Sequence, residues 1–152
     1  KNPYNIHDVL DEASKRISLL LKSKNGKINL NYGADKSTFS LSFEDITNVF
    51  INILENSIKY STNNPEISVK TYNLNDKLYI NFKDNGMGIS NKVKSKIFDK
   101  FFRVSKGNIH NVKGHGLGLS FVKKIIDLHN GTISVNSELG KGSQFIISFN
   151  LK

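Results

Sequence analysis

The chain has no cysteine and no tryptophan, and its apolar runs are short. Without cysteine it can form neither a disulfide nor a thiolate metal site, and this composition is compatible with a reducing compartment. A helix that crosses a membrane needs about 20 consecutive apolar residues, and no run approaches that length. No basic stretch followed by an apolar one stands at the N-terminus, so we expect no signal peptide. These absences leave a soluble globular protein as the expected class.

The 152 residues are 38% hydrophobic and contain no internal repeat, which predicts one domain with one sizeable core. The formal net charge of +9 comes from lysines and arginines scattered along the chain, with only short pairs such as Lys123-Lys124. This scatter is typical of a solvated surface and forms no cluster of the nucleic-acid-binding type. A basic surface also favours anions, and both a nucleotide triphosphate and an acidic partner protein would qualify.

Hydrophobic periodicity and turn residues divide the chain into helices and strands. Asn5 can cap the first helix and Ser42, with an acidic residue three positions later, the second, while Gly26 and Gly131 are expected helix stops. The polar segment 105–113 has the least pattern, which predicts a mobile loop. The expected helices are 5–24, 42–60, 93–98 and 117–129, and the expected strands are 27–32, 38–41, 66–72, 77–83, 132–136 and 144–149, with a hairpin turn at 73–76.

A narrow polar stripe runs along the helix expected at 42–60. At 100° per residue its members fall within about 100° of one another, and apolar residues cover the rest. Asparagine is a poor helix former, so several in one stripe need a reason. The stripe is either a solvent-exposed face without a role or a row of ligand-binding groups. In the second case, amide oxygens would bind a hard cation, the ammonium group would contact phosphate, and the carboxylate would orient or deprotonate a nucleophile. It consists of Asn48, Asn52, Glu55, Asn56 and Lys59.

The position of Asp84 in its strand predicts that its side chain faces the core. Leu78, Ile80 and Phe82 alternate onto one face, and Asp84 follows in the same register. An ionised carboxylate buried without partners is strongly destabilising, so hydrogen-bond donors must surround it. In a structural role, turn amides or a lysine would supply them. In a functional role, the carboxylate would accept from the exocyclic amine of a purine, with room made by the glycines that follow.

Two glycine-spaced segments fit the two halves of a nucleotide pocket. Gly86-Met87-Gly88 follows the strand that ends near Asp84, and 114–118 opens the last expected helix. Glycine has no Cβ, so backbone can approach a base or a phosphate closely, and the first amides of a helix point at an anion placed there. The pattern therefore predicts a base at the first segment and phosphates at the second. The Walker-type phosphate loop is absent.

Four strings of residues resemble the sequence boxes of bacterial sensor histidine kinases. The resemblance covers the chain from about residue 3 and extends to the C-terminal stretch 131–145. The boxes occur in the usual order and at the usual spacings, so a chance match is improbable. They are Asn52-Ile-Leu-Glu-Asn56-Ser-Ile-Lys59-Tyr60, Asp84-Asn-Gly86-Met-Gly88-Ile89, Ile97-Phe98-Asp-Lys-Phe101-Phe102-Arg103 and Gly114-His-Gly116-Leu-Gly118-Leu119.

The resemblance implies the ATP-binding fold that these kinases share with Hsp90-type chaperones, type II topoisomerases and MutL. This fold is an α+β, two-layer α/β sandwich, in which about three helices cover one face of a mixed sheet of about five strands. Residues 1–152 would form a single catalytic domain, with a mobile ATP lid at 104–116.

The same resemblance implies a role for each box residue. Asp84 would accept from the adenine amine, and Gly86 and Gly88 would shape the adenine site. Asn56 would coordinate Mg²⁺ between the phosphates, and Glu55 would activate or orient the acceptor imidazole. The other implied ATP-binding residues are Asn52, Tyr60 and Ile89, then Lys59 and Arg103 at the phosphates, and Gly114, His115, Gly116, Leu117, Gly118 and Leu119 in the last box.

The implied reaction moves the γ-phosphate of Mg-ATP to a histidine on a separate dimerisation domain of the same parent protein, with a response regulator receiver domain as second partner. Residues 1–26 do not look like that histidine-bearing hairpin, and none of His7, His110, His115 and His129 is expected to be the acceptor. We therefore expect no autophosphorylation by this domain alone. The fragment would be monomeric and would belong to the cytoplasmic portion of a membrane-bound, homodimeric parent.

Other functions stay open at this point. A serine kinase that acts on an anti-sigma antagonist and a nucleotide-gated ATPase module would share the fold. A basic nucleic-acid-binding module belongs to another class, and it is disfavoured because Phe98, Phe101 and Phe102 follow a core-like helical spacing.

Overall fold

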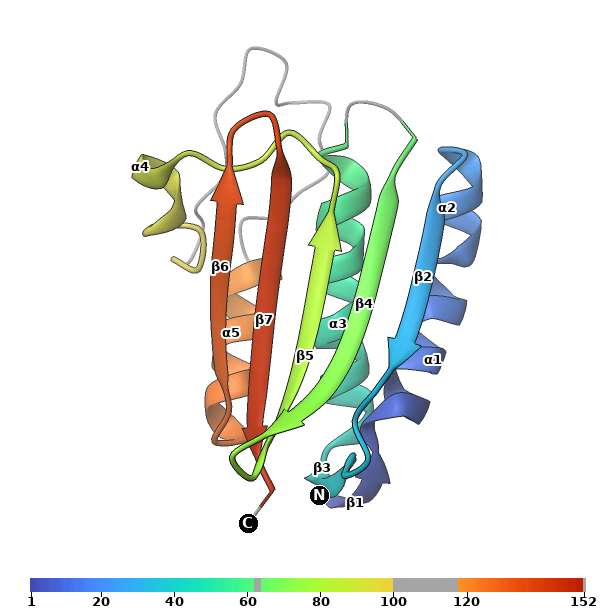
Figure 1. Ribbon diagram of the computed structural model, residues 1–152, viewed down its shortest axis with the longest axis vertical. Helices are drawn as coiled ribbons and strands as arrows, with labels where there is room; N and C mark the ends of the chain where they lie inside the picture. Colours follow the sequence, from blue (N-terminus) through green and yellow to red (C-terminus); the bar gives the residue numbers. More distant parts are fainter. Residues whose placement is uncertain (62–63, 100–117, 152) are drawn as a thin grey trace.

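The computed structural model describes residues 1–61, 64–99 and 118–151 (Figure 1). A five-stranded mixed sheet forms one layer, and the long helices cover one of its faces (Figure 1). The predicted α+β two-layer sandwich is confirmed. In spatial order the strands are β2 (Lys27–Tyr32), β4 (Glu66–Leu74), β5 (Lys77–Asp84), β7 (Gly142–Asn150) and β6 (Thr132–Glu138), with β2 and β4 parallel and the other neighbours antiparallel.

The helical layer lies behind the sheet in Figure 1, whereas the short α4 lies beside the edge strand β6. Phe50 of α3 and Phe82 of β5 join the two layers, with ring centroids 5.5 Å apart. No helix of the described ranges is long and apolar enough to cross a membrane. The helices are α1 (Ile6–Arg16), α2 (Ser18–Ser23), α3 (Phe43–Lys59), α4 (Asn91–Lys94) and α5 (Gly118–Leu128).

The helices α1 and α3 both begin at the predicted cap residues. The Asn5 side chain accepts from the His7 N–H (2.9 Å) at the start of α1, and the Ser42 hydroxyl accepts from the Asp45 N–H (3.4 Å) at the start of α3. The single helix predicted at 5–24 is wrong in one respect, because it is broken at Ile17, which has φ −94° and ψ 2°. The Ser18 hydroxyl donates to the Lys15 carbonyl (2.7 Å) at this point, a local bond that competes with the regular helix.

The helices α4 and α5 also differ from the expectation. The helix predicted at 93–98 is instead α4, because Ser90 caps it by accepting from the Val93 N–H (3.3 Å). The left-handed residue after α5 is Asn130 (φ 57°) rather than Gly131. Gly131 still takes part in ending the helix, because its N–H donates to the Ile126 carbonyl (2.9 Å). It also lies close to β7, since a Cβ there would lie 2.7 Å from the Ser148 carbonyl oxygen.

A separate two-stranded sheet consists of β1 (Asn2–Asn5) and β3 (Thr38–Leu41). Of these two strands, only β3 was predicted. The hairpin between β4 and β5 was predicted. Its two turn residues, Asn75 (φ 52°) and Asp76 (φ 60°), are both left-handed, as the twist of a two-residue hairpin requires. The carboxyl end of β5 lies at the end of the sheet opposite both chain termini (Figure 1).

Candidate functional site

Asp84 ends β5 and is 8% exposed, so the prediction that it faces the core is confirmed. Its Oδ1 accepts from the backbone N–H groups of Gly86 (2.9 Å) and Ser143 (3.1 Å). Its Oδ2 accepts from the Ser57 hydroxyl (2.9 Å). Three segments therefore converge on one carboxylate: α3, the loop after β5, and the start of β7.

The Asp84 carboxylate can accept more hydrogen bonds than the described residues donate to it. A carboxylate offers about four acceptor positions, and among residues 1–61, 64–99 and 118–151 three donors reach Asp84. The two backbone amides on Oδ1 are donors of the kind expected if Asp84 had a purely structural role. The remaining capacity is on Oδ2, which can accept one further donor of a ligand.

Ser57 and Ser143 were missed by the sequence interpretation. Ser57 lies on the apolar face of α3, is 5% exposed, and also has the Ile53 carbonyl within 3.2 Å of its hydroxyl. A lone hydroxyl on such a face needs a hydrogen-bond partner, and that was the available signal. Ser143 contributes its backbone N–H, which no side-chain pattern reveals.

The first glycine segment is held by backbone contacts on two sides. The Met87 N–H donates to the carbonyl of Tyr60 at the end of α3 (3.0 Å), and a Cβ on Gly86 would lie 3.1 Å from that same carbonyl oxygen. Gly88 has φ +76°, and a Cβ there would overlap the carbonyl of Glu138. These glycines therefore permit close backbone packing around Asp84.

The tip of the β6–β7 hairpin completes this packing. The Gly140 N–H donates to the Met87 carbonyl (2.8 Å), and the Ile89 N–H donates to the Ser137 hydroxyl (2.6 Å). Gly142 has φ +90°, and a Cβ there would overlap the Asp84 carbonyl. The loop after β5 is thus held by hydrogen bonds to a hairpin much later in the chain, the Ile89–Ser137 bond spanning 48 positions.

The polar stripe of α3 is half-buried along its whole length. The Asn52 side-chain amide donates to the Asn48 carbonyl (2.8 Å), one turn earlier. In the part of the chain that is described, no side chain pairs with Glu55 or Asn56, so both can accept a ligand.

The start of α5 lies against this stripe. Gly118 is the first residue of the helix, and a Cβ on it would lie 3.1 Å from Asn52 Oδ1. Ile89 and Leu119 are half-buried against the core. The structure therefore brings part of the second glycine segment to the stripe, as the pocket hypothesis requires.

The other predicted site residues divide into two groups. Lys59 ends α3 and Tyr60 caps it, one helical turn beyond Asn56. Among the described residues, no group of three His, Cys, Asp or Glu side chains forms a metal cage. Arg103, Gly114, His115, Gly116, Leu117 and the lid predicted at 104–116 lie outside the described residues.

The family described as histidine kinase-, DNA gyrase B- and HSP90-like ATPases matches residues 42–152, more than half of the chain. The chain belongs to this family. The sensor protein RprX of Bacteroides fragilis is 44% identical over 147 residues, which are 95% of this chain and 28% of RprX. The histidine-protein kinase ArlS of Staphylococcus aureus is 42% identical over 101 residues, which are 66% of this chain and 22% of ArlS. The chain thus spans less than a third of these sensor kinases.

Solved structures agree with this assignment. The catalytic domain of the histidine kinase ThkA matches with a TM-score of 0.80 and 25% identity, covering 98% of this chain and 94% of that one. The mycobacterial sensor histidine kinase MprB matches with a TM-score of 0.81 at 21% identity, covering 97% and 95%, and shows the shared fold. The expected identity, a histidine-kinase-type ATP-binding catalytic domain, is confirmed.

Proposed function

We propose that this domain binds Mg-ATP and transfers the γ-phosphate to a histidine on a separate dimerisation domain of its parent kinase. The observation that carries the proposal is the Asp84 carboxylate, which is buried and tied by three donors but retains acceptor capacity on Oδ2. An exocyclic amine, such as that of adenine, is a matching donor. A purine with a carbonyl at that position would place two acceptors against each other.

The polar stripe is suited to the triphosphate. Asn56 would hold Mg²⁺ through its side-chain oxygen, which fits a cation that keeps most of its ligands from phosphates and water. The metal would supply charge neutralisation during phosphoryl transfer. Lys59 would contact phosphate, Asn52 and Tyr60 would complete the site, and the amides at the start of α5 would face the anion.

The acceptor must come from outside the described residues. His7 is stacked on Tyr32, with ring centroids 4.3 Å apart, and its Nε2 is 2.8 Å from the Thr71 hydroxyl. His129 is held between the Ser42 N–H and the Ile125 carbonyl. Both imidazoles are committed to structural contacts, which supports an acceptor on another domain. Glu55 would activate or orient that imidazole, and Arg103 would contact the γ-phosphate.

The partners follow from the relatives. RprX and ArlS are named as a sensor protein and a signal transduction histidine kinase, and one matching ThkA structure is a complex with the response regulator TrrA. We propose a receiver domain as the second partner here, and a homodimeric, membrane-bound parent. The isolated domain would bind nucleotide without autophosphorylation.

Calorimetry of nucleotide binding tests the proposal. Wild type should bind ATP in a Mg²⁺-dependent manner, and Asp84→Asn should lose at least about tenfold in affinity, because an amide presents a donor toward the adenine amine. Asn56→Asp should alter the Mg²⁺ dependence. Incubation with a separately produced histidine-bearing domain should then yield phosphohistidine. Unchanged affinity in Asp84→Asn would refute the adenine assignment, and transfer to serine would favour the serine-kinase alternative.

A further inference from the structure

A groove lies at the end of the sheet where β5 and β6 end and β7 begins. It has a volume of about 380 Å³, many times that of a water molecule, and its walls come from the ends of β5, β6 and β7 and from α4. Lys83, Gln144 and Asn136 form one row across its floor, because they are register partners on three adjacent strands. Lys94 of α4 and Lys141 of the hairpin turn contribute further ammonium groups to the wall. The remaining lining residues are Asp84, Ser137, Glu138, Gly142 and Ser143.

The row of Lys83, Gln144 and Asn136 lies on the face of the sheet opposite to the Asp84 carboxylate. Successive residues of a strand point to opposite faces, so Lys83 points away from the face that carries the Asp84 carboxylate. Gln144 alternates with Ser143 in the same way. The groove borders the nucleotide site, because Asp84 and Ser143 are also among its lining residues. Its lysines, however, have no part in the proposed ATP chemistry.

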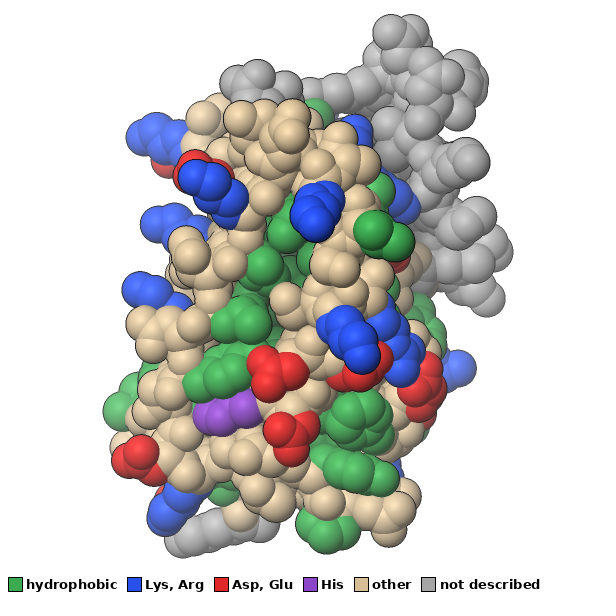
Figure 2. Space-filling view, turned by 90° about the vertical axis from the view of Figure 1, so that its right-hand side faces the viewer, with side chains coloured by type: hydrophobic (Ala, Val, Ile, Leu, Met, Phe, Trp, Pro, Cys, Tyr) green, Lys and Arg blue, Asp and Glu red, His purple; other side chains and the backbone are tan. Residues whose placement is uncertain are grey.

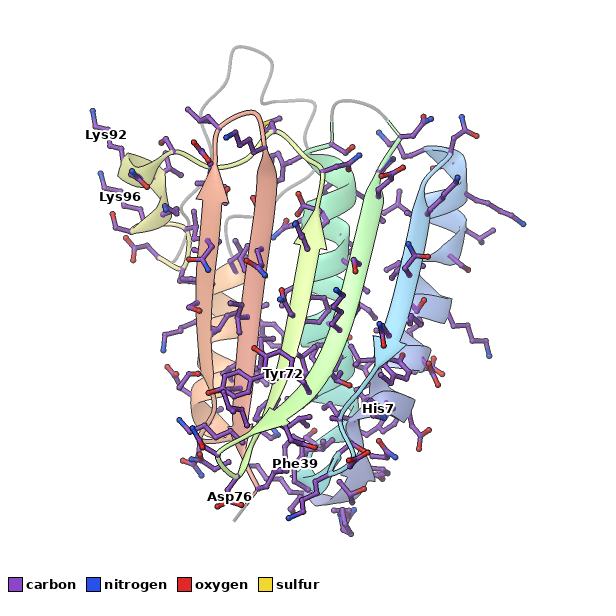
Figure 3. The ribbon with its side chains drawn as sticks, in the orientation of Figure 1. His7, Phe39, Tyr72, Asp76, Lys92 and Lys96 are labelled. Carbon is purple, nitrogen blue, oxygen red and sulfur yellow. The ribbon has the colours of Figure 1, made fainter. Side chains whose placement is uncertain are left out.

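The three lysines that line the groove outnumber its two carboxylates, Asp84 and Glu138, and the Asp84 carboxylate already accepts three hydrogen bonds. Lys141 is 3.5 Å from Glu138, but both side chains are more than 70% exposed, so this pair is weak. Within the described ranges, Lys83 and Lys94 pair with no carboxylate. Lys92 and Lys96 extend from the same segment as Lys94, away from the sheet (Figure 3). By contrast, the edge formed by α1 and β2 carries both acidic and basic side chains (Figure 2).

We propose that this groove binds an acidic segment of a partner protein. Its three ammonium groups come from three separate elements and act as exposed point charges, which suits carboxylates spaced along a chain. The Asn136 and Gln144 amides can donate to carboxylates or to the peptide backbone. A compact phosphate would favour an arginine fork or a cradle of backbone amides, and none of the described residues that line the groove is an arginine.

Fluorescence anisotropy with a labelled oligoglutamate peptide tests this proposal, at about 0.05 M and about 0.15 M salt. The combined variant Lys83→Gln, Lys94→Gln, Lys141→Gln should bind about tenfold more weakly, because each exposed ion pair contributes a few-fold. The matched control is Lys22→Gln, Lys24→Gln, Lys36→Gln, which removes the same charge from exposed positions outside the groove and should change affinity less than about twofold.

A variant with the opposite expectation guards against misfolding of the triple variant. Glu138→Gln removes the carboxylate that competes for Lys141 and should tighten peptide binding about twofold. Equal weakening by the groove and control variants would show a nonspecific charge effect and overturn the proposal. The proposal is likewise overturned if the groove variant binds the peptide as wild type does. A third contrary result would be that the groove variant loses more affinity for single-stranded DNA or phosphatidylserine vesicles than for the peptide.

Discussion

The hydroxyl of Ser57 and the carboxylate of Asp84 are joined by a hydrogen bond of 2.9 Å across 27 positions of sequence. Ser57 lies on the core side of α3, whereas Asn52 and Asn56 lie in the polar stripe. One helix therefore contributes to the candidate site from two faces, through the amides proposed to bind the ligand and through a hydroxyl that holds the buried carboxylate.

The substitution Ser57→Ala removes this hydrogen bond and should lower both stability and nucleotide affinity. It leaves Asp84 Oδ2 without its protein donor in a buried setting, so the free energy of unfolding should fall by about 1–3 kcal/mol. The affinity for ATP should fall as well, because the carboxylate loses its fixed orientation. Urea unfolding and calorimetry measure the two effects. Ser134→Ala, on the exposed face of β6, is the control and should leave both unchanged; equal values for the two variants would refute this role of Ser57.

Gly88 and Gly140 offer a comparison of steric overlap with backbone strain. Both have positive φ, +76° and +81°, but a Cβ on Gly88 would overlap the Glu138 carbonyl, whereas a Cβ on Gly140 would meet nothing within 4 Å. Gly140→Ala should cost about 1–2 kcal/mol of stability from the left-handed backbone alone. Gly88→Ala should cost clearly more. Thermal and urea unfolding of both variants test this, and equal losses would show that the contact with Glu138 is unimportant.

His129 should make stability depend on pH. Burial lowers its pKa from the usual 6.5, although the hydrogen bond to the Ile125 carbonyl opposes this shift. The ring accepts from the Ser42 N–H (3.1 Å) at the start of α3, which requires an unprotonated Nε2. Because the folded-state pKa is the lower one, the unfolded state takes up the proton first, and stability should fall as pH decreases through about 6.5.

Urea unfolding from pH 8 to pH 5 measures this dependence. His129→Gln should show a shallower profile than wild type. Part of the slope should persist, because burial also lowers the pKa of His7, next to Tyr32 and Thr71. Superimposable profiles of wild type and His129→Gln would contradict the proposed contribution.

The sequence predicted those features whose cause is local. Asn5 and Ser42 cap helices through residues two or three positions away, and the inward direction of Asp84 follows from strand alternation alone. The order of the four boxes and the spacing of their glycines were enough to predict the family and the fold.

The missed features depend on partners far away in the sequence. The strand β1 is four residues long and exists because it pairs with β3, and no local pattern announces that pairing. Likewise, the donors to Asp84 from Ser57 and Ser143 arise only when three segments meet. The roles assigned to Arg103 and His115 stay predictions, because both residues lie outside the described part of the chain.

The position of β7 has a consequence for how the protein is made. This strand is the last of the sheet in sequence, yet it lies between β5 and β6. Once β6 has emerged from the ribosome but β7 has not, β5 and β6 therefore cannot yet be joined, and Asp84 still lacks its Ser143 donor. We expect the central sheet and the nucleotide site to form together, when β7 inserts.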